Sequence, residues 1–141
     1  MREILFRGKT VIDDKWVYGD LRNHLGNKWI YTPPDRENDG YPHVLKVDNA
    51  TVGQYTGLTD SNGVKVFEGD ILKISRQIGA GGTYYYFPAI PYPCDVVVRW
   101  DYCAWMWETL AEDKYYITFP DAWCHYTYEV IGNIHDKEVD V

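Results

Sequence analysis

The sequence is poor in features that several protein classes need. Its three cysteines are an odd number and include no Cys-x-x-Cys pair, which excludes a disulfide framework and a cysteine-rich zinc knuckle. No apolar run approaches the roughly 20 residues of a membrane-spanning helix. The N-terminal run Ile4-Leu5-Phe6 is far shorter than the core of a signal peptide. We therefore expect free thiols, no membrane partner and a cytoplasmic location.

The chain also lacks an excess of positive charge. It carries 14 Lys and Arg against 21 Asp and Glu, a formal net charge of −7. Nucleic-acid affinity rests largely on clustered cations that release counterions from phosphates, so this composition disfavours a general nucleic-acid binder. A local basic face stays open, because Arg2, Arg7, Lys9 and Lys15 lie near the N-terminus.

Aromatic residues, in contrast, are abundant. The 141 residues include six Trp and 13 Tyr, and each large ring buries about 150–250 Å² of surface in a folded protein. Disordered chains have few aromatics and low hydrophobicity, so this chain is expected to fold. Its length suits one compact core, and we predict a single domain over residues 1–141.

Short alternating runs separated by turn residues predict a mainly β fold. Lys15 to Leu21 is expected to pair with Glu3 to Gly8 as an N-terminal hairpin, with Gly19 at a bulge or a close backbone approach. Asn62-Gly63 predicts a second hairpin, since this pair tolerates the positive φ angles of a tight turn. We expect a hairpin layer, a small, partly open barrel and a short helix over residues 108–114. An α+β arrangement is the alternative.

Four segments of the chain form a recognisable series: Arg2 to Lys9, Trp16 to Leu21, Gln54 to Leu72 and Glu129 to Asp136. The third contains Gln-Tyr-Thr-Gly-Leu-Thr-Asp followed by Glu-Gly-Asp-Ile, and the fourth contains Val-Ile-Gly-Asn-Ile. In this order the segments resemble the YopX-like family of proteins. The resemblance implies a phage or prophage protein in the cytoplasm of a bacterial host, with no established biochemical function. It supplies no catalytic residues.

Three carboxylates are the first candidates for chemistry. A hairpin that gathers Asp60, Glu68 and Asp70 would offer the oxygen ligands that Mg²⁺ and Ca²⁺ prefer. Turn chemistry is the favoured interpretation, because Asp60 opens a turn and Glu68-Gly69-Asp70 is typical of a strand-entry corner.

His125 beside Cys124, with Cys94 and Cys103 upstream, is the second candidate, for zinc ligands or a Cys-His pair in nucleophilic catalysis. Structural roles are favoured, because the spacing matches no zinc signature and adjacent residues on a strand point to opposite faces. We predict no enzyme, no catalytic residue, no metal and no cofactor.

The tyrosine-rich segment after Gly82 is the candidate partner interface. Its residues are Tyr84, Tyr85, Tyr86, Phe87 and Tyr92. Exposed tyrosines anchor protein interfaces or stack on bases, and a strand that packs alternate rings into the core is the structural alternative. We predict an accessory protein that binds itself as a homo-oligomer, or binds another phage or host protein. A single-stranded nucleic-acid or transcription-linked module is the alternative function.

Overall fold

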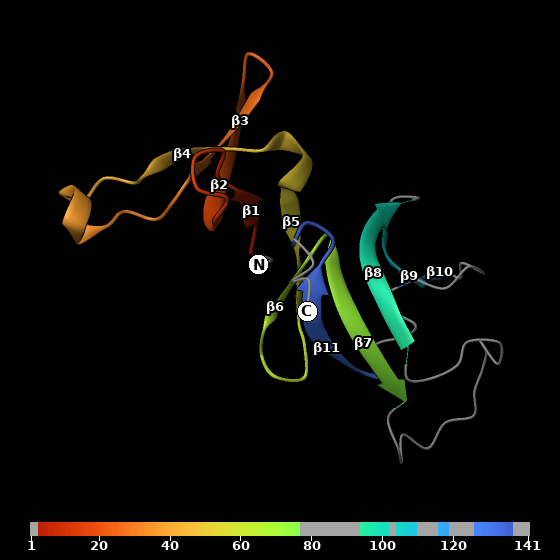
Figure 1. Ribbon diagram of the computed structural model, residues 1–141. Coiled ribbons are helices and arrows are strands. Elements are labelled where there is room, and N and C mark those ends of the chain that lie inside the picture. Colours follow the sequence, from red (N-terminus) through yellow and green to blue (C-terminus); the bar gives the residue numbers. More distant parts are fainter. Residues whose placement is uncertain (1–2, 77–93, 102–103, 110–115, 119–125, 137–141) are drawn as a thin grey trace. The chain divides into compact units, whose positions relative to one another are not determined.

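The computed structural model describes residues 3–76, 94–101, 104–109, 116–118 and 126–136. Within them the chain is mainly β, with antiparallel strands and two short 3-10 helices (Figure 1). The predicted fold class is therefore confirmed. The chain divides into two compact units, Met1–Gly57 and Leu58–Val141. This division does not test the single domain expected over residues 1–141, which stays a prediction.

The first unit is built on a sheet with the strand order β4-β3-β2-β1-β5. Strand β5 begins here and ends in the second unit, where β6 is its neighbour. The elements are β1 (Phe6–Lys9), β2 (Trp16–His24), β3 (Asn27–Tyr31), η1 (Arg36–Asn38), β4 (Val44–Val47), η2 (Asn49–Thr51) and β5 (Gly53–Thr59). The predicted N-terminal hairpin is confirmed, since Phe6 lies opposite Gly19 and Lys9 lies opposite Trp16.

Gly19 marks the point where β2 changes partner. Residues 16–19 of β2 pair with β1, and residues 20–24 pair with β3. A Cβ atom on Gly19 would lie 2.0 Å from the carbonyl oxygen of Tyr31. The close backbone approach expected at Gly19 is confirmed, and the approach leaves no room for a side chain.

The outer edge of β4 is partly covered by the chain that follows β1. The Asp48 N–H donates to the Lys9 carbonyl over 2.8 Å, and the Val11 N–H donates to the Lys46 carbonyl over 3.1 Å. The first sheet thus curls back on itself at one end, although the described strands form no closed barrel.

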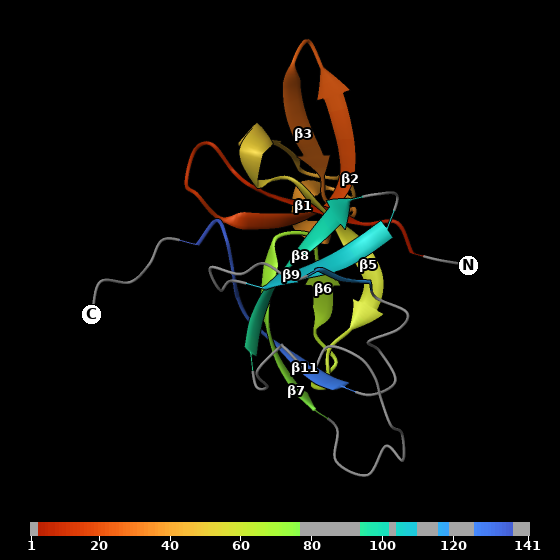
Figure 2. The same cartoon turned by 90° about the vertical axis from the view of Figure 1, so that its right-hand side faces the viewer.

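The second unit contains a five-stranded antiparallel sheet with the order β10-β9-β8-β7-β11, which Figure 2 shows from the side of β8 and β9. The strands are β6 (Lys65–Phe67), β7 (Asp70–Arg76), β8 (Cys94–Asp101), β9 (Ala104–Thr109), β10 (Tyr116–Thr118) and β11 (Tyr126–Asn133). Residues 108 and 109, expected to begin a short helix, belong to β9. Their pairing with β8 outweighs the local helix signal, and residues 110–114 lie outside the described residues.

One face of this sheet carries the core of the second unit. The register aligns Leu72 with Val96 and Val130, and Val98 with Trp107. The buried cluster is Val66, Leu72, Ile74, Val96, Val98, Trp105, Trp107 and Tyr128. Burying each large side chain contributes about 1.5–3 kcal/mol, so this cluster makes a large contribution to the stability of the unit.

Candidate functional site

Asp60 uses its carboxylate to hold the β5–β6 hairpin. Oδ1 accepts from the N–H groups of Asn62 and Val64 over 2.9 and 2.8 Å. The Asp60 N–H donates to the Val64 carbonyl, and the Gly63 N–H donates to the Asp60 carbonyl. Only Gly63 of the Asn62-Gly63 pair has a positive φ, of 81°. The predicted hairpin is confirmed with a loop one residue longer than a two-residue turn, which the Asp60 carboxylate bridges.

The same turn covers the outer edge of β11. Asp60 Oδ2 accepts from the Val130 N–H over 2.9 Å, and the Ser61 N–H and hydroxyl donate to the Tyr128 carbonyl over 3.1 and 3.0 Å. An edge strand with open backbone groups is a template for unwanted pairing. The two residues of the turn therefore satisfy backbone groups that β7 does not reach.

Asp70 is the second carboxylate with a structural role. Its side chain lies in the core, and Oδ2 accepts from the Phe67 N–H over 2.7 Å. Gly69 has a φ of 89°, donates its N–H to Val98 and accepts from the Ile134 N–H. The predicted strand-entry corner is confirmed. In the part of the chain that the structure describes, no three His, Cys, Asp or Glu side chains form a metal-binding group.

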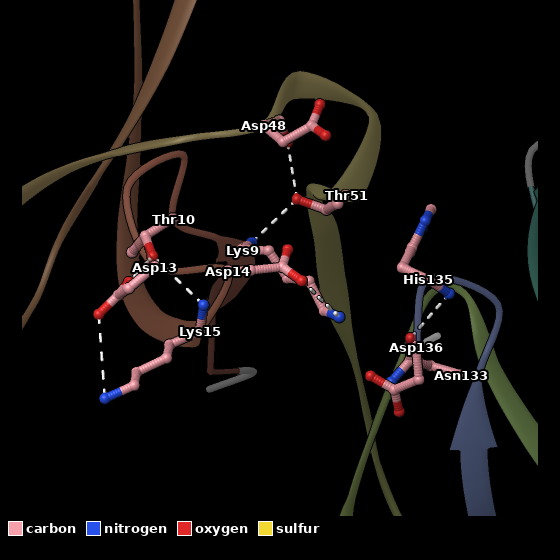
Figure 3. Close-up of polar contacts among 10 residues, drawn as sticks. All are labelled: Lys9, Thr10, Asp13, Asp14, Lys15, Asp48, Thr51, Asn133, His135 and Asp136. Carbon is pink, nitrogen blue, oxygen red and sulfur yellow. Dashed lines mark hydrogen bonds and ion pairs between the residues drawn. The ribbon is translucent and has the colours of Figure 1, made fainter. Parts of the chain in front are cut away.

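The corner after β11 is held by Asn133. Its Oδ1 accepts from the His135 N–H over 2.8 Å, and its Nδ2 donates to the Asp136 carboxylate over 2.6 Å (Figure 3). The third and fourth segments that resemble the YopX-like family meet within the second unit, where the Val130 N–H donates to the Asp60 carboxylate and the Ile134 N–H donates to the Gly69 carbonyl.

Of the four cations near the N-terminus, Arg7 and Lys9 do not contribute to an exposed basic face, Lys15 is exposed and Arg2 lies outside the described residues. Arg7 and Lys9 are buried, with the guanidinium carbon 4.4 Å and the ammonium nitrogen 5.3 Å from the Trp16 ring centroid. Lys9 also lies 3.9 Å from a carboxylate oxygen of Asp14, and its N–H donates to the Thr51 hydroxyl (Figure 3). The interior of the first unit can hold these two cations because cation–π contact with Trp16 offsets part of the cost of desolvating them.

A different set of cations lies on the exposed face of the first sheet. The register places Arg22 of β2 opposite Trp29 of β3, and Trp29 opposite Lys46 of β4. Tyr31 follows on the same face, two residues beyond Trp29. We call Arg22, Trp29, Tyr31 and Lys46 the β3 platform. The sequence did not identify these four residues as neighbours, because strand register decides which residues lie opposite one another.

A groove of about 460 Å³ adjoins the β3 platform. Its lining includes Lys46 of the β3 platform, the aliphatic side chains of Val11 and Ile12, and the carboxylates of Asp14 and Asp48. Ile12 is 88% exposed and Val11 is 53% exposed. The groove is therefore a mixed polar and apolar surface.

Other residues proposed from the sequence lie outside the described part of the structure. They are Tyr84, Tyr85, Tyr86, Phe87, Tyr92, Cys103, Cys124 and His125. None of the helices in the described segments has the length and apolar character needed to span a membrane.

The described residues define a mainly β protein of two antiparallel sheets, in which the carboxylates of Asp60 and Asp70 fix a turn and a corner. The family model described as YopX protein matches residues 5–138. The chain therefore belongs to the YopX family, and the resemblance noted from four segments is confirmed. A search of curated proteins finds no match.

Proposed function

We propose that this chain is an accessory protein encoded by a phage or prophage, that it works in the cytoplasm of a bacterial host, and that it acts through binding rather than catalysis. The observation that carries the choice of binding is the use of Asp60 and Asp70. Each of these carboxylates accepts hydrogen bonds from backbone N–H groups that fix a turn or corner. The structural use of these two carboxylates supports binding over catalysis.

Self-association is the favoured form of binding. The tyrosine-rich segment from Tyr84 to Tyr92 supports it, because tyrosines are enriched in the energetically dominant parts of interfaces. Exposed aliphatic side chains on the first unit, among them Ile12 and Leu25, add apolar surface that a partner would bury.

Light scattering after size-exclusion chromatography tests this proposal on the full chain. We expect the mass of an oligomer at micromolar concentration, and a shift toward the monomer when Tyr84, Tyr85 and Tyr86 are all changed to Ser. Tyr41→Ser is the matched control, since Tyr41 is an exposed tyrosine of the first unit. A wild-type chain that runs as a monomer contradicts self-association.

A single-stranded nucleic-acid or transcription-linked module is the second candidate function. The distribution of charged residues between the two units supports it. Residues 1–57 contain eight Lys and Arg against eight Asp and Glu, whereas residues 58–141 contain six against 13. The whole net charge of −7 thus belongs to the second unit. The overall acidity that counts against nucleic acid does not apply to the first unit.

A further inference from the structure

The β3 platform combines the two kinds of side chain that single-stranded nucleic acids need. Arg22, Trp29 and Lys46 form one row across three strands, and directly opposite residues have Cβ atoms about 4.5–5.5 Å apart. Ile30 and Val47, which alternate with this row, are buried on the opposite face of the sheet. The row therefore lies on the solvent side.

The two aromatic residues of the β3 platform lie on the solvent side of the sheet. Trp29 and Tyr31 are half-buried as whole residues, and residues two apart on a strand lie roughly 7 Å from each other. Aromatic rings at such positions stack with bases, and this stacking tolerates any sequence because every base has a π-face. The two rings thus provide two neighbouring stacking positions.

The two cations of the β3 platform are available to phosphates. Neither Arg22 nor Lys46 makes an ion pair within the described segments of the chain. This separates them from Arg7 and Lys9, which are buried against Trp16. A cation on each side of Trp29 matches a ligand that alternates negative phosphates with planar bases.

We propose that the β3 platform is a binding surface for single-stranded nucleic acid, with Trp29 and Tyr31 stacking on bases and Arg22 and Lys46 contacting phosphates. The inference rests on the second candidate function and names its site. An acidic protein segment would use the same cations. The two rings between the cations favour nucleic acid, because phosphate charge and base stacking together use all four side chains.

Asp20 sets a limit on this surface. It lies opposite Tyr31 on the same face, and its carboxylate repels a phosphate there. Phosphate contact is therefore expected around Trp29 more than around Tyr31. Asp20→Asn removes this repulsion, and we expect it to tighten binding by about 2- to 5-fold at low salt, corresponding to a rim charge effect of up to about 1 kcal/mol.

Fluorescence anisotropy with a labelled oligothymidylate of about 20 nucleotides tests the proposal, since single-strand sites span about 4–16 nucleotides. The full chain is titrated at several salt concentrations. Trp29→Leu keeps an apolar side chain and removes the ring, and is expected to weaken binding about 5- to 150-fold. The double variant R22E/K46E is expected to lower the magnitude of the salt slope by about 1.4, which is the loss of two phosphate contacts.

Lys28→Glu is the matched control, because Lys28 lies on the same strand as Trp29 and alternates to the other face. Lys65→Glu in the second unit changes the net charge by the same amount and therefore measures the effect of net charge alone. After this effect is subtracted, we expect Lys28→Glu to bind within about 2-fold of wild type. Circular dichroism melts of every variant separate loss of binding from loss of folding.

Three outcomes would overturn the proposal. Wild-type binding that is unchanged by both Trp29→Leu and R22E/K46E assigns nucleic acid to another surface and leaves the second candidate function standing. No binding at about 0.05 M salt ends both the site and the second candidate, while self-association is still decided separately by light scattering. A polyglutamate peptide that binds as tightly as the oligonucleotide, with no loss on Trp29→Leu, assigns the surface to an acidic protein.

Discussion

The two units use their charged residues in opposite ways. In the first unit, Arg7 and Lys9 are buried against Trp16, while Arg22 and Lys46 stand on the solvent side of the sheet. In the second unit, buried carboxylates bind backbone N–H groups at turns. The difference teaches that the net charge of the whole chain does not describe the first unit, since the first unit is neutral by count and the second carries the acidity.

The largest expected effect breaks the core of the second unit alone. Trp107 is fully buried in the cluster on its sheet, so Trp107→Ala is expected to lower the free energy of unfolding by about 3–5 kcal/mol. Hydrogen exchange on the full chain should show loss of protection in β7, β8 and β11 with retained protection in β2 and β3. Equal loss in both units would favour the single cooperative domain expected from the sequence.

Removing the Asp60 carboxylate tests how the second unit uses a charge. Asp60→Ala leaves the N–H groups of Asn62, Val64 and Val130 without their acceptor, and we expect a loss of about 2–4 kcal/mol because hydrogen bonds to charged groups contribute about 1.5–3 kcal/mol. Urea denaturation measures the loss. Ser61→Ala removes one hydroxyl bond at the same turn, and a loss as large as that of Asp60→Ala would contradict the role of the carboxylate.

Gly19→Ala tests the first unit in the same way. The added Cβ would meet the Tyr31 carbonyl oxygen at 2.0 Å, so the strands must separate where β2 changes partner. We expect a loss of about 1–3 kcal/mol, as for other overpacked sites, and faster exchange of amides in β2 and β3. Gly26→Ala is a useful contrast, since open space surrounds Gly26 and its φ of 80° alone is strained. Unchanged exchange in β2 and β3 would count against the close approach.

The smallest expected effect on stability comes from the exposed face of the first sheet, where Arg22 and Lys46 are compared with the buried cations. Arg22→Glu and Lys46→Glu are expected to change the free energy of unfolding by no more than about 0.5 kcal/mol each, because neither side chain makes an ion pair in the described segments. Thermal melts measure this change. A loss above about 2 kcal/mol would show that these cations support the fold, as Arg7 and Lys9 do.

Local signals in the sequence predicted much of the fold. The hairpin between β1 and β2, the close approach at Gly19 and the β5–β6 hairpin each depend on neighbouring residues or on one glycine. These three features could be predicted because turn-forming residues and the alternation of apolar and polar residues act over short distances along the chain.

The candidate surface depends on long-range register, which the sequence does not specify by itself. Trp29 becomes a neighbour of both Arg22 and Lys46 only when β2, β3 and β4 align. Burial of Arg7 and Lys9 likewise depends on Trp16 lying across β1. Charge and composition left a local basic face near the N-terminus open, and strand pairing decides that Arg7 and Lys9 are buried whereas Arg22 is exposed.

The turn that covers β11 also has a consequence for folding while the chain is being synthesised. Asp60 and Ser61 are made well before Val130 and Tyr128, their partners 70 and 67 residues later in the chain. While the chain is growing, β7 is complete and its edge toward β11 is still open. A nascent chain of this protein therefore carries an exposed strand edge until its last described strand emerges, and this interval is when aggregation or chaperone capture is expected to compete with folding.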